Sequence, residues 1–307
     1  MSIVRLDPEF DMLVPPDAQI EKLANGFTFI EGPIWRSKGA LWFSDVIGNM
    51  TRQWSPDGKV VELLRPGGYD GSSLPAGGYI GPNGATAGEH GTVVMCQHGN
   101  RRLVSITDDL RVTSIVDNFE GKKLNSPNDV VYRSDGSMYF TDPPYGLPKF
   151  DDDPMKELPF NGVFKLTKGK LDVIITNMTR PNGLAFSPDE KTLYLANSDE
   201  NDRIWMRYDV APDGSVSHGE VFADVTAETD SGLPDGMKID SHGNIWATGP
   251  GGIWVFTPGG KHLGTIKPPE QPANIAWGDD WTTLFITACT GLYRLKTSVM
   301  GQKLVYS

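Results

Sequence analysis

The chain has 307 residues, 38% of them hydrophobic, with 35 glycines, 23 prolines and a net charge of −11. This acidic composition argues against nucleic-acid binding, which needs clustered Lys and Arg, and the many glycines and prolines favour short strands and tight turns over a helical bundle. Because no apolar run approaches eighteen residues and the N-terminus lacks the build of a signal peptide, we expect a cytoplasmic protein without a membrane segment.

The start of the chain differs from the rest. Residues 1–17 are polar and contain prolines, and we expect them to form an N-terminal arm over the surface. Residues 18–307 are expected to form a single domain, because a repeated pattern fills them to the C-terminus. Within this domain Ile20–Ala24 alternates like an edge strand, and pairing it with the last strands of the chain would close a ring of sheets.

One arrangement of residues recurs six times. In its full form a polar residue in a Pro-containing turn precedes a short apolar run, a second turn and a second apolar run. Alignment on the first apolar run gives six equivalent positions, 38 to 54 residues apart: Glu31, Asn83, Asn128, Asn182, Asp235 and Ala273. Repeats of this length, rich in β-branched and aromatic residues, are typical of propeller blades. The sequence therefore predicts an all-β, six-bladed β-propeller with these positions around its axis.

Two long segments interrupt the repeat. Residues 67–79 join the first blade to the second, and residues 143–161 separate the second and third strands of the third blade. In an up-and-down blade both segments lie on the same face as the six central positions. Long loops are uncommon unless functional, so we expect these two to form the wall or lid of a pocket; a surface insertion without a role is the alternative.

The six central positions offer a set of hard oxygen donors. Two are carboxylates, Glu31 and Asp235, and three are amides, Asn83, Asn128 and Asn182. Such donors suit Ca²⁺, Mg²⁺ or Mn²⁺ and lack the His or Cys that zinc usually recruits. We therefore expect a central metal site. The alternative is that each side chain caps its own turn.

Other polar side chains are candidates on the same face. The second strands end at Asp45, Gln97, Asp142 and Asn197, whose side chains would either touch substrate or cap the strand ends. His98 is the histidine to consider as an acid or base, with a turn residue as the alternative. Arg180 would either bind an anionic group or pair with surface carboxylates.

The short motifs together resemble one family. They are Glu31-Gly32-Pro33-x-Trp35, Ser126-Pro127-Asn128-Asp129, Pro181-Asn182-Gly183-Leu184 and Pro234-Asp235-Gly236-Met237. In this order the chain is similar to the gluconolactonase / SMP-30 / regucalcin family of six-bladed propellers, and Thr141-Asp142-Pro143-Pro144-Tyr145-Gly146 resembles its bacterial gluconolactonase branch. Animal members have an Arg where this chain has Ser126.

The resemblance implies a site. Glu31, Asn182 and Asp235 would bind one divalent cation, with Asn128 as a further ligand or a substrate-binding residue. Ca²⁺ is the first choice of ion, and Mg²⁺, Mn²⁺ or Zn²⁺ are alternatives. Asp235 or Asp142 would act as the catalytic acid/base. The expected substrate-binding residues are Asn128, Asn83, Arg180, His98 and Tyr145.

The predicted function is metal-dependent hydrolysis of a small sugar lactone, such as glucono-1,5-lactone, to its aldonic acid. The cation would polarise the carbonyl and activate water. We expect a monomer or a weak homo-oligomer. The alternatives are a related propeller hydrolase acting on other esters or organophosphates, and a non-enzymatic calcium-binding propeller.

Overall fold

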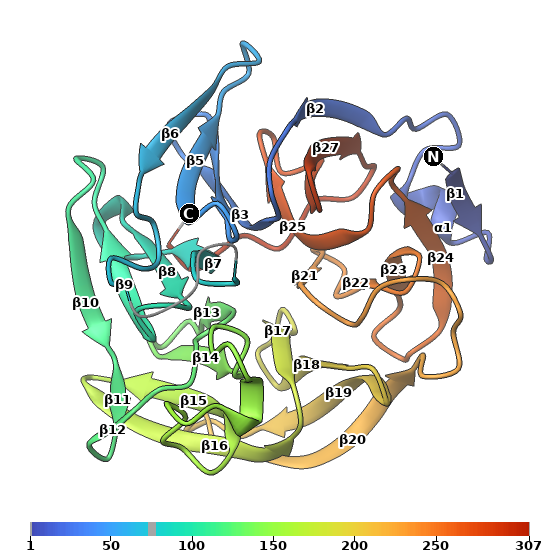
Figure 1. Ribbon diagram of the computed structural model, residues 1–307. Helices are drawn as coiled ribbons and strands as arrows, with labels where there is room; N and C mark the ends of the chain where they lie inside the picture. The colour runs from blue at the N-terminus through green and yellow to red at the C-terminus, as the bar shows by residue number, and fades with distance from the viewer. Residues whose placement is uncertain (1, 73–77, 307) are drawn as a thin grey trace.

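A computed structural model describes residues 2–72 and 78–306, and within them six antiparallel sheets surround a central axis (Figure 1). The predicted all-β, six-bladed propeller is confirmed. Blades one to three comprise β3 (Ile30–Arg36), β4 (Ala40–Asp45), β5 (Met50–Trp54) and β6 (Val60–Leu64); β7 (Pro82–Ala87), β8 (Val93–Gln97), β9 (Arg102–Ile106) and β10 (Val112–Val116); β13 (Val130–Tyr132), β14 (Met138–Asp142), β15 (Asn161–Thr167) and β16 (Lys170–Met178). Blades four to six comprise β17 (Pro181–Phe186), β18 (Thr192–Asp199), β19 (Asp202–Val210) and β20 (Val216–Asp224); β21 (Met237–Ile239), β22 (Ile245–Gly249), β23 (Gly252–Phe256) and β24 (His262–Lys267); β25 (Pro272–Gly278), β26 (Thr283–Ala288) and β27 (Gly291–Lys296).

The second strand of each blade lies in the hydrophobic core. All residues of β4, β8, β14, β22 and β26 are buried, because the sheet has a neighbouring blade on each face. These strands therefore read as continuous apolar runs. Small elements complete the blades: the hairpin β11 (Asn118–Phe119) and β12 (Lys122–Lys123), and the 3-10 turns Glu89–Gly91 and Phe150–Asp152.

The ring of blades is closed by the N-terminal strand β2 (Glu21–Asn25). It pairs antiparallel with β27 as the outer strand of blade six, with Glu21 opposite Arg294 and Asn25 opposite Gly291. The predicted closure between the two ends of the chain is confirmed. It gives the sixth blade its fourth strand and joins the first and last parts of the propeller.

The N-terminal arm packs against blade five. Strand β1 (Ser2–Arg5) pairs with β24 as a fifth strand, and α1 (Phe10–Leu13) follows it. Phe10 is fully buried, in one hydrophobic cluster with Trp246 and Leu263. Sequence analysis did not predict this strand, because four polar and apolar residues without alternation do not distinguish a strand from a loop.

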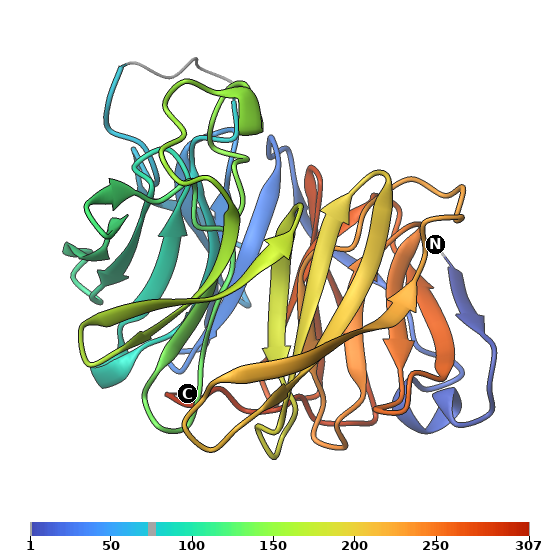
Figure 2. The same cartoon turned by 90° about the horizontal axis from the view of Figure 1, so that it is seen from below.

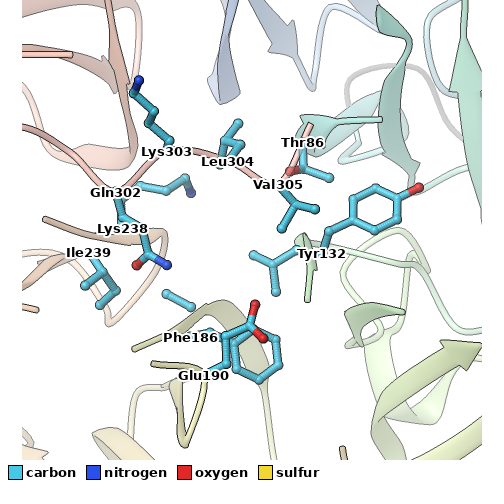
Figure 3. A pocket seen from close by; sticks show the side chains of 12 residues that line it. Thr86, Tyr132, Phe186, Glu190, Lys238, Ile239, Gln302, Lys303, Leu304 and Val305 are labelled. Carbon is cyan, nitrogen blue, oxygen red and sulfur yellow. The ribbon is translucent and has the colours of Figure 1, made fainter. Parts of the chain in front are cut away.

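The two faces of the propeller carry different segments. The described parts of the two long loops rise from one face, and the C-terminus lies toward the other (Figure 2). Residues 73–77 of the first predicted loop lie outside the described residues. At the other end of the axis the tail residues Gln302–Val305 line a small cavity of about 70 Å³ with Lys238 (Figure 3). No helix within residues 2–72 and 78–306 is long and apolar enough to span a membrane.

The buried arm predicts a stability effect. Phe10→Ala should lower the free energy of unfolding by about 3–5 kcal/mol, because it leaves a cavity in the cluster on blade five. Met12→Ala is the control, since Met12 in the same helix is 67% exposed. Urea unfolding of both variants measures the difference. Equal midpoints would show that the arm does not contribute to the core.

Candidate active site

A cavity of about 380 Å³ lies on the axis at the face of the long loops. The structure brings together in its lining the five polar residues that the repeat aligned: Glu31, Asn83, Asn128, Asn182 and Asp235. Each lies near the start of the innermost strand of its blade, and the five residues come from five consecutive blades. The propeller geometry therefore converts a repeat in sequence into a cluster in space.

Glycines allow these inner strands to approach one another. A Cβ on Gly32 would lie 1.9 Å from the carbonyl oxygen of Asn83, and one on Gly183 would lie 2.3 Å from that of Asp235. Neither distance is possible for a side chain, and Gly32 also has a positive φ of 51°. Gly32 and Gly183 are thus required by the contact between blades, in addition to any role in a turn.

His98 orients the amide of Asn83. Its Nδ1 lies 3.2 Å from the carbonyl oxygen of Tyr79, which can only accept, so Nδ1 carries the proton. Nε2 then accepts from Asn83 Nδ2 at 3.0 Å, and the Asn83 carbonyl oxygen is left for the cavity. Burial lowers the pKa of His98 to about 4. His98 is therefore a neutral imidazole at pH 7 that positions Asn83.

Ser198 has the same relation to Asn182. Asn182 Nδ2 donates to Ser198 Oγ at 2.8 Å, and Ser198 Oγ donates to the Pro234 carbonyl. Asn182 Oδ1 is thereby left as the acceptor. Sequence analysis did not assign Ser198 this role, because it follows the aligned strand-end residue Asn197 and carries no motif of its own. These contacts also argue against simple turn-capping, since neither amide bonds its own turn.

The two carboxylates of the cluster are held in a poorly hydrated position. Burial, and then the charge of Asp129, raises the pKa of Glu31 to about 7. Burial, and then the charge of Glu31, raises the pKa of Asp235 well above its ordinary value. A hydrogen bond from Asn182 acts in the opposite direction on Asp235. Two carboxyl groups of raised pKa therefore face one cavity. Such groups are expected at a site that binds a cation or transfers a proton.

Asp142 is placed outside the cavity lining. It is fully buried, and its oxygens accept the main-chain N–H groups of Asn125 at 2.7 Å and Ser126 at 2.8 Å. Asp45 and Asn197 accept from Thr28 and Arg180 main-chain N–H groups in the same way. In these three blades the residue at the end of the second strand thus holds the loop that precedes the inner strand. Burial raises the pKa of Asp142 to about 7, and its geometry is that of a loop anchor.

Arg180 is also not brought into the cavity. Its guanidinium forms an ion pair with Asp151 and donates to the Thr179 carbonyl. Ser126 is buried under the second long loop, where its Oγ accepts from Gly146 N–H at 2.8 Å. Neither residue lines the cavity.

The walls come from the loops and from the strand ends. Tyr79 and the pair Tyr145 and Phe150 line the cavity from the first and second long segments. Tyr145 OH donates to the Ser198 carbonyl at 3.1 Å, which joins the second loop to blade four. Phe29, Leu233 and Glu200 also line the cavity, and sequence analysis did not assign them to it. The expectation that the long segments form a wall is met by these residues.

The donor set fits a hard divalent cation. Asn83 and Asn182 turn carbonyl oxygens toward the cavity, and Glu31 and Asp235 add two carboxylates. In the described part of the chain no group of three His, Cys, Asp or Glu side chains could hold a metal ion. The candidate ligands here are two carboxylates combined with amides, and that mixture has the oxygen chemistry of a Ca²⁺ or Mg²⁺ site.

Comparison with known proteins identifies the family. The family model for the SMP-30/Gluconolactonase/LRE-like region matches residues 29–290. The chain belongs to this family. The resemblance read from the sequence motifs is thereby confirmed.

Two relatives cover nearly all of the chain, and a third covers less than half of it. A gluconolactonase from Zymomonas mobilis is 39% identical over 97% of this chain and 87% of its own length. A gluconolactonase of known structure from Xanthomonas campestris has a TM-score of 0.83 and 31% identity, covering 97% of this chain and 95% of its own. A pentonolactonase from Haloferax volcanii is 34% identical over 42% of this chain and 45% of its own length.

The raised pKa values predict proton release on cation binding. A cation favours the ionised carboxylates, so binding near pH 7 should displace protons from Glu31, whose pKa is about 7, and affinity should fall as the pH drops through 7. Calorimetric titration with Ca²⁺ in buffers of different ionisation enthalpy measures the proton number. Glu31→Gln should release fewer protons. A binding heat independent of the buffer would contradict the prediction.

Proposed function

We propose that the protein is a divalent-cation-dependent lactonase that opens sugar lactones such as glucono-1,5-lactone to aldonic acids. The observation that carries this proposal is the open cavity in which two carboxylates and oriented amides converge. Its volume, about 380 Å³, is in the range of small-molecule sites. The names of the similar gluconolactonases and pentonolactonase support the same reaction.

Glu31, Asn128, Asn182 and Asp235 are the residues that would hold the cation. All four offer oxygen and line one cavity, which favours Ca²⁺, with Mg²⁺, Mn²⁺ or Zn²⁺ as alternatives. When bound, such an ion polarises a lactone carbonyl and lowers the pKa of a bound water.

Asp235 is the proposed acid/base. Its carboxylate lines the cavity and would take a proton from the attacking water and return it to the ring oxygen as the ester bond breaks. Asp142, the other candidate, has both oxygens engaged by main-chain N–H groups away from the cavity. The geometry therefore favours Asp235 for this role.

The remaining lining residues would bind the sugar. Asn83, positioned by His98, presents a polar group to lactone hydroxyls, and contact with the sugar is the alternative to the ligand role for Asn128. Tyr79, Tyr145 and Phe150 provide apolar faces for the C–H side of the ring. Since His98 is neutral and Arg180 pairs with Asp151, we propose that neither forms an ion pair with the substrate.

The open cavity also bears on the alternatives. A structural ion has its coordination filled by protein, whereas a catalytic ion keeps a position accessible to water or substrate. The proposed ligands lie in a cavity with room for a ligand, which favours an enzyme over a calcium-binding protein. Other esters and organophosphates fit the same chemistry and are the alternative substrates.

The proposal predicts cation-restored turnover. Proton release from glucono-1,5-lactone and several pentonolactones should stop after chelation and return on addition of Ca²⁺, Mg²⁺, Mn²⁺ or Zn²⁺. Glu31→Gln should abolish cation binding and activity, whereas Glu220→Gln, an exposed residue paired with Arg207 on blade four, should leave both intact. Turnover of aryl esters or organophosphates alone would move the assignment to those substrates. Full lactone turnover by a Glu31→Gln, Asp235→Asn double variant would refute the mechanism.

The two aspartates should be separable by their effects. Measured at saturating cation, so that the loss of a ligand is offset, Asp235→Asn should lower kcat by roughly 10²- to 10⁴-fold, the range for loss of a general base, with little change in thermal stability. Asp142→Asn places an NH₂ group against main-chain donors and should cost about 1–3 kcal/mol of folding free energy. Steady-state kinetics and thermal unfolding of both variants test this. A folded, equally stable Asp142→Asn protein without activity would reverse the assignment.

A further inference from the structure

Blade six contributes a polar side chain to the axis one residue after the aligned position. Ala273 occupies the aligned position and has no polar side chain, whereas Asn274 follows it and is only 2% exposed. A Cβ on Gly236 would lie 2.1 Å from Asn274 Cγ. The Asn274 side chain therefore fills the space that a glycine leaves beside Asp235 of blade five.

The orientation of the Asn274 amide is fixed from both sides. Its Oδ1 accepts from the Ile275 main-chain N–H at 2.9 Å and from the Lys238 ammonium at 3.3 Å. Its Nδ2 donates to Glu31 Oε2 at 2.9 Å. A flipped amide would set NH₂ against two donors and an oxygen against a carboxylate, so this is the stable orientation.

The contact with Asn274 makes the two oxygens of Glu31 unequal. Oε2 accepts both the Asn274 amide and the Gly32 main-chain N–H. Oε1 accepts no hydrogen bond from any residue in the described ranges 2–72 and 78–306, and Glu31 lines the substrate cavity. Oε2 is thus a fixed anchor and Oε1 is left for a ligand.

Lys238 reaches Asn274 from the side opposite the substrate cavity. It lines the small cavity at the far end of the axis, beside Gln302 and Leu304 of the C-terminal tail (Figure 3). Its ammonium also donates to the Met237 carbonyl at 3.0 Å, which restricts where it can lie. A chain of contacts therefore runs along the axis from Lys238 through Asn274 to Glu31.

We propose that Asn274 is a positioning residue for the cation site: held by Lys238 and Ile275, its amide fixes Glu31 so that one carboxylate oxygen faces the cation. This inference rests on the proposed cation-dependent function. It adds to that function a residue from blade six, which supplies no ligand of its own and does not line the substrate cavity.

The test is the cation affinity of Asn274→Leu, measured by calorimetry with Ca²⁺ on the purified, chelated protein. The substitution keeps the size of the side chain and removes the donor to Glu31. The Kd should rise by about 10- to 100-fold, the range for loss of residues that orient metal ligands. Activity should recover at high Ca²⁺ with an unchanged KM for the lactone, because Asn274 does not touch the substrate. A general loss of structure would not be rescued in this way.

Asn244→Leu is the matched control. Asn244 is also buried, and its Nδ2 donates at 2.8 Å to the carboxylate of Asp240, but it lies outside the cavity lining. It should lose stability and bind Ca²⁺ like the wild type. Asn274→Ala removes the same donor without bulk and serves as the second variant, should the leucine fail to fit.

The outcomes separate the two proposals. Wild-type affinity in the folded Asn274 variants would overturn the positioning role and leave the lactonase proposal intact. Failure of the wild-type protein to bind a divalent cation would refute the cation-dependent function, and the positioning role with it. Equal loss of affinity in Asn244→Leu would attribute the effect to destabilisation and also overturn the inference.

Discussion

Buried carboxylates repel one another at the axis of the propeller, and the neighbouring blades supply the groups that offset this repulsion. Glu31, Asp129 and Asp235 come from blades one, three and five, and burial raises the pKa of each. Removing such groups from water costs several kcal/mol per ion unless opposite charge is near. Lys238 provides one positive charge from the far side and lowers the pKa of Glu31 and Asp129. A dication in the cavity would balance the remaining two.

Amides occupy the blades between the acids. Asn83, Asn182 and Asn274 come from blades two, four and six, and each donates its NH₂ group to a specific partner: His98, Ser198 and Glu31. Blade three contributes both an acid and an amide, Asp129 and Asn128, and no two of the three carboxylates Glu31, Asp129 and Asp235 come from adjacent blades. The frame that enforces this spacing is the closed ring, sealed by β2 on β27, whose inner strands meet at glycines with no room for a side chain. A ring open at that seam could let the acids move apart, so closure and charge are linked.

The sequence was sufficient to predict the residues that recur in every blade, but not the hydrogen-bond partners of those residues. Glu31, Asn83, Asn128, Asn182 and Asp235 were predicted together because the repeat places them at one height on one axis. Asn274 and Ser198 were missed, since their partners lie in other blades or one residue off the aligned position. Arg180 and Asp142 share the predicted face, but strand period does not tell whether a side chain turns toward the axis or back to its own loop. The strand β1 was not predicted because its four residues, Ser2–Arg5, show no alternation that would distinguish a strand from a loop.

The repeated strands and the two long loops contribute different properties to this site. The groups that would bind a cation and move a proton belong to the repeat, where every blade constrains its neighbours through backbone contacts. Tyr79, Tyr145 and Phe150 belong to the two segments that interrupt the repeat and are free to differ in length without disturbing the ring. A propeller of this kind can therefore keep one hydrolytic centre while its loops select the ester. The residues of the repeated inner strands then determine the type of reaction, and the loops that form the cavity walls determine which lactone is bound.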